Sequence, residues 1–159
     1  MKFFLSFLLI FSFGFAHASK MLQGRVVSVA DGDTITVIDA EKNQHKIRLQ
    51  SIDAPEKAQA FGAKSKEALY ELVHGKTVQV SFIKSDKYGR ILGKVLLDGQ
   101  DICHQQIKAG FAWHYKKYQN EQQPVDRDAY SASEIAAKSQ KLGLWSEPSP
   151  VAPWDFRKR

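Results

Sequence analysis

The first half of the chain alternates short apolar stretches with polar turns, which is typical of a β-sheet. Residues 22–29 are rich in valine and are followed by Asp31-Gly32, a dipeptide that favours a hairpin turn. Residues 34–38 are mostly β-branched, and residues 45–49 alternate polar and apolar side chains after a polar turn. These segments predict a three-stranded meander.

The pattern then changes to that of an amphipathic helix. Residues 61–74 place leucine and valine side chains on one helical face, and Gly75 follows where a helix commonly ends. Strand-like composition returns at 78–83 and at 91–97, with a polar turn that contains Gly89 between them. We therefore predict one helix inserted between the third and fourth strands.

Two further helices are predicted after the strands. Residues 102–109 form a short helix closed by Gly110, and residues 127–141 form a longer one closed by Gly143. Three strands, a helix, two strands and then helices are compatible with a small barrel of the OB type. The predicted fold is therefore α+β and mainly β, with a five-stranded OB-type β-barrel and about three helices.

The two ends of the chain differ from this domain. Met1-Lys2 precede an apolar run that ends at Ala16-His17-Ala18, which is the pattern of a cleavable secretory signal. About 13 apolar residues are too few for a membrane-spanning helix, which needs roughly 20. We expect cleavage after Ala18, a secreted or periplasmic location and no stable membrane association afterwards. The expected organisation is a signal at 1–18, one folded domain at 19–146 and a proline-rich basic tail at 147–159, which we expect to be irregular.

The single cysteine changes how stability is explained. An exported chain with one cysteine has no internal disulfide, so its stability must come from its core. Cys103 stands beside His104, but adjacent residues of a helix or strand point in different directions. A buried structural cysteine is therefore expected rather than a thiol nucleophile.

The charge balance indicates what kind of partner the protein has. The formal net charge is +6, and the predicted signal contributes only one of the 23 basic residues, Lys2. A basic exported domain is suited to a polyanion such as nucleic acid, although a basic surface alone favours this only slightly.

Two acidic segments are candidates for binding a metal ion. A hairpin turn needs only Asp31 and Gly32, so Asp33, which enters the next strand, is a candidate oxygen ligand. Asp53 and Glu56 follow a predicted strand, with proline between them to restrict the backbone. The alternative interpretations are an ordinary turn and a surface salt bridge, which stabilises by only about 0–1 kcal/mol.

These oxygen donors suit a hard cation better than a soft one. Ca²⁺ takes about six to eight oxygens from carboxylates, backbone carbonyls and water. Asp33, Asp53 and the backbone carbonyl of Ala54 can supply three, and Glu56 can reach the ion through water. The histidines and Cys103 show no spacing typical of zinc sites.

Two further segments combine cations with aromatic side chains. The turn at 86–90 contains Lys87, Tyr88 and Arg90, and arginine suits phosphate oxygens because it binds them with two parallel hydrogen bonds. Residues 113–118 interleave tryptophan and tyrosines with lysines, a composition that binds single strands by stacking and charge. Core packing of Trp113 is the alternative interpretation.

Taken together, four motifs resemble the staphylococcal nuclease (thermonuclease) family. They are Asp-Gly-Asp-Thr at 31–34, Arg48 followed by Asp-Ala-Pro-Glu at 53–56, Asp-Lys-Tyr-Gly-Arg at 86–90 and Gly-Leu-Trp-Ser-Glu at 143–147. The match covers nearly the whole chain after the signal. The resemblance implies an OB barrel with three helices and Ca²⁺-dependent cleavage of DNA and RNA that leaves 3′-phosphates.

The resemblance also implies a role for each matching residue. Asp33, Asp53 and the carbonyl of Ala54 would ligate calcium. Arg48 and Arg90 would bind the scissile phosphate, and Glu56 would act on the attacking water. The expected nucleotide contacts are Lys87, Tyr88 and Tyr118, to which the aromatic composition adds Tyr115.

The chain departs from the type enzyme of the family at two places. Ala54 stands where that enzyme has threonine, which a backbone ligand tolerates, and the loop at 57–60 is shorter and lacks a lysine-rich stretch. We expect a monomeric enzyme. The alternative is an OB module that binds nucleic acid without cutting it, but such a module has no need for Asp33, Glu56 and both arginines together.

Overall fold

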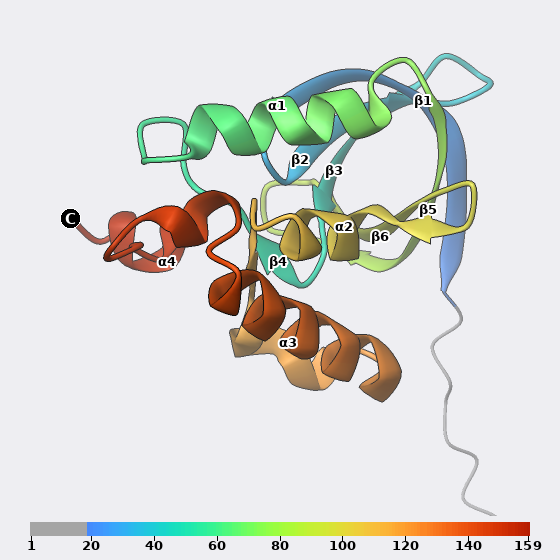
Figure 1. Cartoon of the computed structure of the whole chain (residues 1–159). Helices are drawn as coiled ribbons and strands as arrows, with labels where there is room; N and C mark the ends of the chain where they lie inside the picture. Colours follow the sequence, from blue (N-terminus) through green and yellow to red (C-terminus); the bar gives the residue numbers. More distant parts are fainter. Residues whose placement is uncertain (1–18) are drawn as a thin grey trace, which may run out of the picture.

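A computed structural model describes residues 19–159, and the predicted signal at 1–18 lies outside the described residues. Five strands close into a barrel (Figure 1). They are β1 (Lys20–Asp31), β2 (Thr34–Ile38), β3 (Gln44–Leu49), β5 (Thr77–Ser85) and β6 (Ile91–Leu97). Each coincides with a strand predicted from the sequence, so the mainly β, OB-type α+β fold is confirmed.

One parallel strand pair closes the barrel. β1 pairs antiparallel with β2 and β5, β2 with β3, and β5 with β6. β3 and β6 run parallel, with Ile47 opposite Ile91 and Arg48 opposite Leu92. Because of this pair, the end of β3, which carries Arg48, lies beside the start of β6, which directly follows Arg90.

Helices cover the barrel on the outside (Figure 1). The three predicted helices are α1 (Gly62–Val73), α2 (Ile102–Lys108) and α3 (Pro124–Ser139). The tail was expected to be irregular, but it contains a further short helix, α4 (Pro153–Phe156). Its proline at the first helical turn lacks an N–H that would have no partner there, so this proline starts the helix instead of preventing it. No helix within residues 19–159 has the length and apolar character needed to cross a membrane.

Short elements connect these parts. The small strands are β4 (Ile52–Asp53), β7 (Gln100–Asp101) and β8 (Trp113–His114), and the 3₁₀ helices are η1 (Lys116–Glu121) and η2 (Gly143–Ser146). β4 pairs with β8, with Asp53 opposite Trp113. This pairing places the segment after β3 against the segment that precedes η1.

The barrel interior is a continuous apolar core. Its fully buried side chains include Val26, Ile35, Ile47 and Val95. Cys103 belongs to the same core, with its Sγ 3.8 Å from the carbonyl oxygen of Gly93. Burial raises the pKa of this thiol, which keeps it protonated. The predicted structural role of the cysteine is confirmed.

Candidate active site

A tight turn between β1 and β2 brings Asp33 to the end of the barrel. A Cβ atom on Gly32 would lie 1.9 Å from Ser65 Oγ and 2.7 Å from Ala54 Cβ, so only glycine fits there. The side chain of Gln106 on α2 donates to the carbonyls of Gly32 and Ser65 at 2.8 and 3.2 Å. This fully buried glutamine, which the sequence analysis did not single out, therefore holds the turn against α1.

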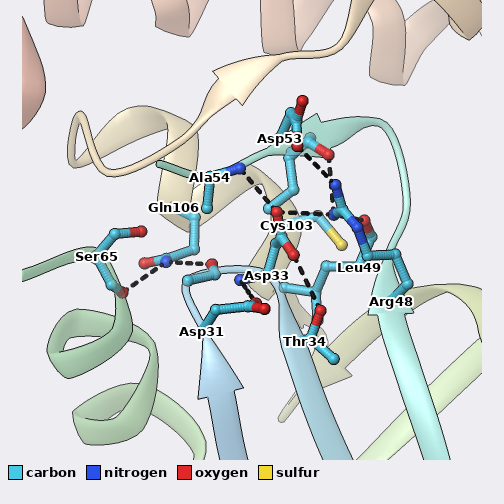
Figure 2. A network of polar contacts seen from close by, with 12 residues as sticks. Asp31, Asp33, Thr34, Arg48, Leu49, Asp53, Ala54, Ser65, Cys103 and Gln106 are labelled. Carbon is cyan, nitrogen blue, oxygen red and sulfur yellow. Dashed lines mark hydrogen bonds and ion pairs between the residues drawn. The ribbon is translucent and has the colours of Figure 1, made fainter. Parts of the chain in front are cut away.

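Asp33 contacts both β3 and the segment that follows it (Figure 2). The backbone N–H of Ala54 donates to its Oδ2 at 2.7 Å, and Arg48 Nη1 lies 2.9 Å from the same oxygen. The hydroxyl of Thr34 donates to its other carboxylate oxygen at 3.0 Å. Asp33 and Ala54, predicted to act together, therefore lie in direct contact.

One guanidinium bridges two buried carboxylates. Arg48 Nη2 lies 2.8 Å from Asp53 Oδ1, while Nη1 contacts Asp33. Nη1 also donates to the carbonyls of Leu49 and Ile52 at 3.2 and 3.1 Å. Asp33 and Asp53 are only 5% and 1% exposed, so their charges depend on this bridge.

The bridge does not fully compensate the charge of Asp33. Burial raises the pKa of Asp33 to about 7, although the Arg48 guanidinium and the Ala54 N–H oppose the increase. The neighbouring charges of Asp31 and Asp53 raise this pKa further. A buried carboxylate with a raised pKa is stabilised in its charged form by additional positive charge. Asp33 is therefore a candidate cation ligand.

A second guanidinium, missed by the sequence analysis, lies on the other side of Asp53. Arg157 directly follows α4, and its Nη2 lies 2.8 Å from Asp53 Oδ2. Its Nη1 lies 3.2 Å from Asp53 Oδ1 and 2.7 Å from Glu56 Oε1. Hydrogen bonds to Asp53 raise the pKa of Arg157. No local pattern indicated this contact, because about a hundred residues separate Arg157 from its partners.

Glu56 lies at the rim of this cluster in a compact turn. Its backbone N–H donates to Gln59 Oε1 at 3.1 Å, and its carbonyl accepts from the Gln59 N–H at 2.8 Å. A Cβ on Gly62 would lie 2.0 Å from the Glu56 carbonyl oxygen, so the chain packs tightly behind it. The Glu56 side chain is 38% exposed. Its carboxylate can therefore meet both solvent and the buried pair.

Arg90 does not contact this cluster. Its Nε lies 2.7 Å from Asp86 Oδ2, and the backbone N–H groups of Arg90 and Tyr88 donate to Asp86 Oδ1 at 3.0 and 2.9 Å. The ring of Tyr88 lies 5.6 Å from Arg90 Cζ and 5.0 Å from Lys87 Nζ. Of the five central residues predicted together, the structure thus gathers Asp33, Arg48, Asp53 and Glu56 and holds Arg90 within its own turn.

The aromatic segment next to β4 divides into a packed and an exposed part. The ring centroids of Trp113 and Trp145 lie 4.3 Å apart in an edge-to-face arrangement. This contact favours the alternative interpretation of Trp113, in which its ring packs against the core. The rings of Tyr115 and Tyr118 lie 5.6 Å apart, and Tyr118 is 49% exposed. The Tyr115 N–H donates to the carbonyl of Ser51 at 2.9 Å. Tyr115 therefore lies close to the segment that carries Asp53.

The residues at this site fit a weakly bound hard cation. Asp33 and Asp53 supply carboxylate oxygens that converge on one guanidinium, and such oxygens are the donors that Ca²⁺ prefers. Within residues 19–159 no three histidine, cysteine, aspartate or glutamate side chains are grouped as a metal site. A cation here would therefore take its remaining ligands from backbone and water.

Similarity to known proteins extends along nearly the whole chain. The family model described as "Staphylococcal nuclease homologue" matches residues 46–147. An Escherichia coli protein named "Uncharacterized endonuclease" is 43% identical over 153 residues, which cover 96% of this chain and 95% of that protein. A Haemophilus influenzae protein of the same name is 38% identical over 154 residues, covering 97% and 83%. A Shigella flexneri protein named "Micrococcal nuclease" is 37% identical over 145 residues, covering 86% and 80%.

The family model covers part of the site described above. Its range contains Arg48, Asp53, Glu56 and Arg90, whereas Asp33 precedes it and Arg157 follows it. The C-terminal segment that carries α4 and Arg157 therefore contributes to the site from outside the range that the model describes.

Proposed function

Since this chain belongs to the staphylococcal nuclease family and is a hydrolase of phosphodiester bonds, we propose that it is an exported nuclease that uses Ca²⁺ to cleave DNA, RNA or both. The observation that carries the proposal is the buried pair Asp33 and Asp53, bridged by Arg48 beside the accessible carboxylate of Glu56. Export is supported by the signal pattern at residues 1–18.

Each residue of the cluster has a task in this proposal. Asp33, Asp53 and the backbone carbonyl of Ala54 would hold Ca²⁺, which would supply positive charge that polarises the phosphate. The Arg48 side chain is 14% exposed, so one edge of its guanidinium can meet a phosphate oxygen. Arg90 supplies a second guanidinium when the substrate phosphate replaces Asp86 as its partner.

Glu56 acts on the water molecule that attacks phosphorus. Its carboxylate accepts a proton from this water or orients it, and the 5′-oxygen leaves, so the product carries a 3′-phosphate. No residue forms a covalent bond to the substrate. Positioning and charge stabilisation by the two arginines then account for most of the rate acceleration.

One experiment tests this function directly. The purified chain beginning at Ser19 is incubated with DNA and with RNA, in Ca²⁺ or in a chelator, and the product ends are identified. We expect cleavage only with Ca²⁺ and only 3′-phosphate ends. Cleavage that persists in the chelator, or 5′-phosphate ends, would falsify the mechanism. Binding without any cleavage would instead support the non-catalytic OB module.

Arg157 is expected to compete with the cation for the same oxygens. Its guanidinium must leave Asp53 and Glu56, at least in part, before a cation binds there. A partly exposed ion pair contributes about 1 kcal/mol, so Arg157→Gln should lower the Kd for Ca²⁺ about fivefold. Isothermal titration calorimetry measures this Kd without any substrate.

Arg159→Gln is the matched control for this prediction. It removes the same charge from the same tail, and Arg159 forms none of the ion pairs that the structure contains within residues 19–159. An equal change in Kd for both variants would mean that only the net charge of the tail matters, which contradicts direct competition.

A further inference from the structure

A groove is bounded by β8 and the residues that follow it, by helix α3 and by the segment that carries helix α4. It has a volume of about 530 Å³. Its lining includes Tyr115, Lys116, Lys138, Trp154, Arg157 and Lys158, and we call it the α4 groove. The predicted nucleotide contacts include only Tyr115 among these residues, and the carboxylate cluster includes only Arg157, so the other four have no role in the site described above.

The α4 groove is strongly cationic. Of the described residues that line it, five are lysine or arginine and only Glu134 is acidic. Lys138 Nζ lies 3.1 Å from Glu134 Oε2, and Lys116 binds the same oxygen. The backbone N–H of His114 donates to Glu134 Oε1 at 3.0 Å. Glu134 is thus shared by two lysines, and Lys158 is paired with Asp155 at 2.9 Å. Lys117 also lines the groove and has no ion pair among those of residues 19–159, so its charge is available to a ligand.

An aromatic surface lies along the same groove. The ring centroids of Trp154 and Tyr115 lie 5.4 Å apart at an angle of 35°, and those of Trp154 and Trp113 lie 5.5 Å apart in an edge-to-face arrangement. These contacts hold Trp154 in place while it remains half-buried. Positioned aromatic rings beside lysines are the combination that binds unpaired bases and their phosphates.

The groove is continuous with the carboxylate cluster. Arg157 lines the groove and also contacts Asp53 and Glu56 at 2.8 and 2.7 Å. A strand whose phosphate lies at Arg48 and Glu56 would therefore pass Arg157 as it leaves the cluster. The next nucleotides would meet Trp154 and the lysines.

The C-terminal segment is docked against the rest of the domain by contacts within the chain. Gln59 Nε2 in the shortened loop donates to the carbonyl of Val151 at 2.5 Å. Ala152 and Pro153 are buried, so the start of α4 is packed against the domain. A preformed wall loses little conformational entropy on binding, which favours affinity.

We propose that the α4 groove binds the single-stranded nucleic acid next to the cleaved bond, through stacking on Trp154 and Tyr115 and through phosphate contacts to the lysines. This inference rests on the proposed function and adds to it a binding subsite built by the C-terminal segment. An unpaired strand fits better than a duplex, because bases must leave their stack to reach an aromatic ring. It fits better than an acidic peptide, which has no bases to stack.

Binding is tested apart from cleavage. The chain from Ser19 to Arg159 with Glu56→Gln is mixed, in chelator, with a fluorescent oligothymidylate of about ten nucleotides, a length within the range such grooves cover. Anisotropy gives the Kd at several salt concentrations. Lys117→Gln with Lys158→Gln should weaken binding and lower the slope of log K against log salt by about 1.4, since each single-strand phosphate contact contributes about 0.7.

The matched control removes one lysine from the turn between β2 and β3 and one from the first half of β3, and this turn lies far from α4 (Figure 1). Lys42 and Lys46 are exposed and have no ion pair among those of residues 19–159. Lys42→Gln with Lys46→Gln should leave the slope nearly unchanged. Equal slopes for the two double variants would overturn the proposal.

Two further measurements identify the ligand. Trp154→Ala should weaken strand binding at least about fivefold, and Trp154→Phe should recover part of the loss. A duplex that binds as tightly as the single strand, or polyglutamate that displaces it equally well per charge, would overturn the assignment. If the unmodified enzyme cleaves no nucleic acid, the proposed function fails, but these affinities still decide whether the groove binds a strand.

Discussion

Replacing Arg48 with alanine is expected to lower the cleavage rate by at least about 100-fold, the scale of one lost transition-state stabiliser. The substitution removes the phosphate contact and also the bridge between Asp33 and Asp53. Arg48→Lys should recover little, because one ammonium group cannot reproduce the two-sided fork that meets both carboxylates and two backbone carbonyls. Single-turnover rates on a labelled oligonucleotide measure the effect.

Arg48→Ala is also expected to destabilise the fold. A broken buried ion pair usually costs about 3–5 kcal/mol. The loss here should be smaller, because Asp53 keeps Arg157 and because the pKa of Asp33 is already about 7, so it can bind a proton. Urea unfolding measures the change, and Ca²⁺ should restore part of it by replacing the missing positive charge.

Arg25→Ala is the control for both measurements. Arg25 is an exposed arginine on β1 and has no ion pair among those of the described residues. Its replacement should change neither rate nor stability appreciably. Cleavage by Arg48→Ala at the rate of the Arg25→Ala control would contradict the role of the Arg48 guanidinium.

Replacing Glu56 with glutamine is also expected to lower turnover by at least about 100-fold, with little change in the fold. Glutamine keeps the shape of the side chain but cannot accept a proton from the attacking water. The Glu56 side chain is 38% exposed and is not part of the core, so the thermal unfolding temperature of the variant should stay close to that of the unmodified protein. Glu67→Gln, an exposed change on α1, is the matched control.

The contact with Arg157 offers a second explanation of a Glu56 effect, and a double-mutant cycle separates the two. If Glu56 acts on water, Glu56→Gln should be as harmful in the Arg157→Gln background as in the unmodified chain. A loss of rate that disappears in that background would show that Glu56 serves mainly to hold Arg157, which would contradict the proposed role.

The strands and helices that build the barrel were predictable from the sequence, since they depend on residues close to one another. Alternation at 45–49 and the helical spacing at 61–74 reflect which faces must be buried, and β3 and α1 occupy nearly these residues. The acidic site was predictable for a similar reason. The turn at 31–34 and the segment at 53–56 are short motifs, and closure of the barrel brings Asp33 and Asp53 to one guanidinium.

Only the tertiary structure decided which further cationic and aromatic side chains lie near these carboxylates. Arg90 was predicted to bind the scissile phosphate, and in the structure it is paired with Asp86, four residues earlier, because a nearby partner can be reached at little cost in chain entropy. The tail was expected to be irregular, yet α4 places Trp154 and Arg157 beside the site.

The sequence by itself thus indicated the barrel strands and the main helices, because hydrophobic period and turn chemistry are local properties. Its motifs also named the four residues that the structure brings together, which are Asp33, Arg48, Asp53 and Glu56. It did not determine that Arg157 meets Asp53 and Glu56. That contact joins residues about a hundred positions apart, and it depends on how Val151, Ala152 and Pro153 pack against the finished domain. Such packing leaves no periodic signal in a short basic tail, so only the folded chain shows it.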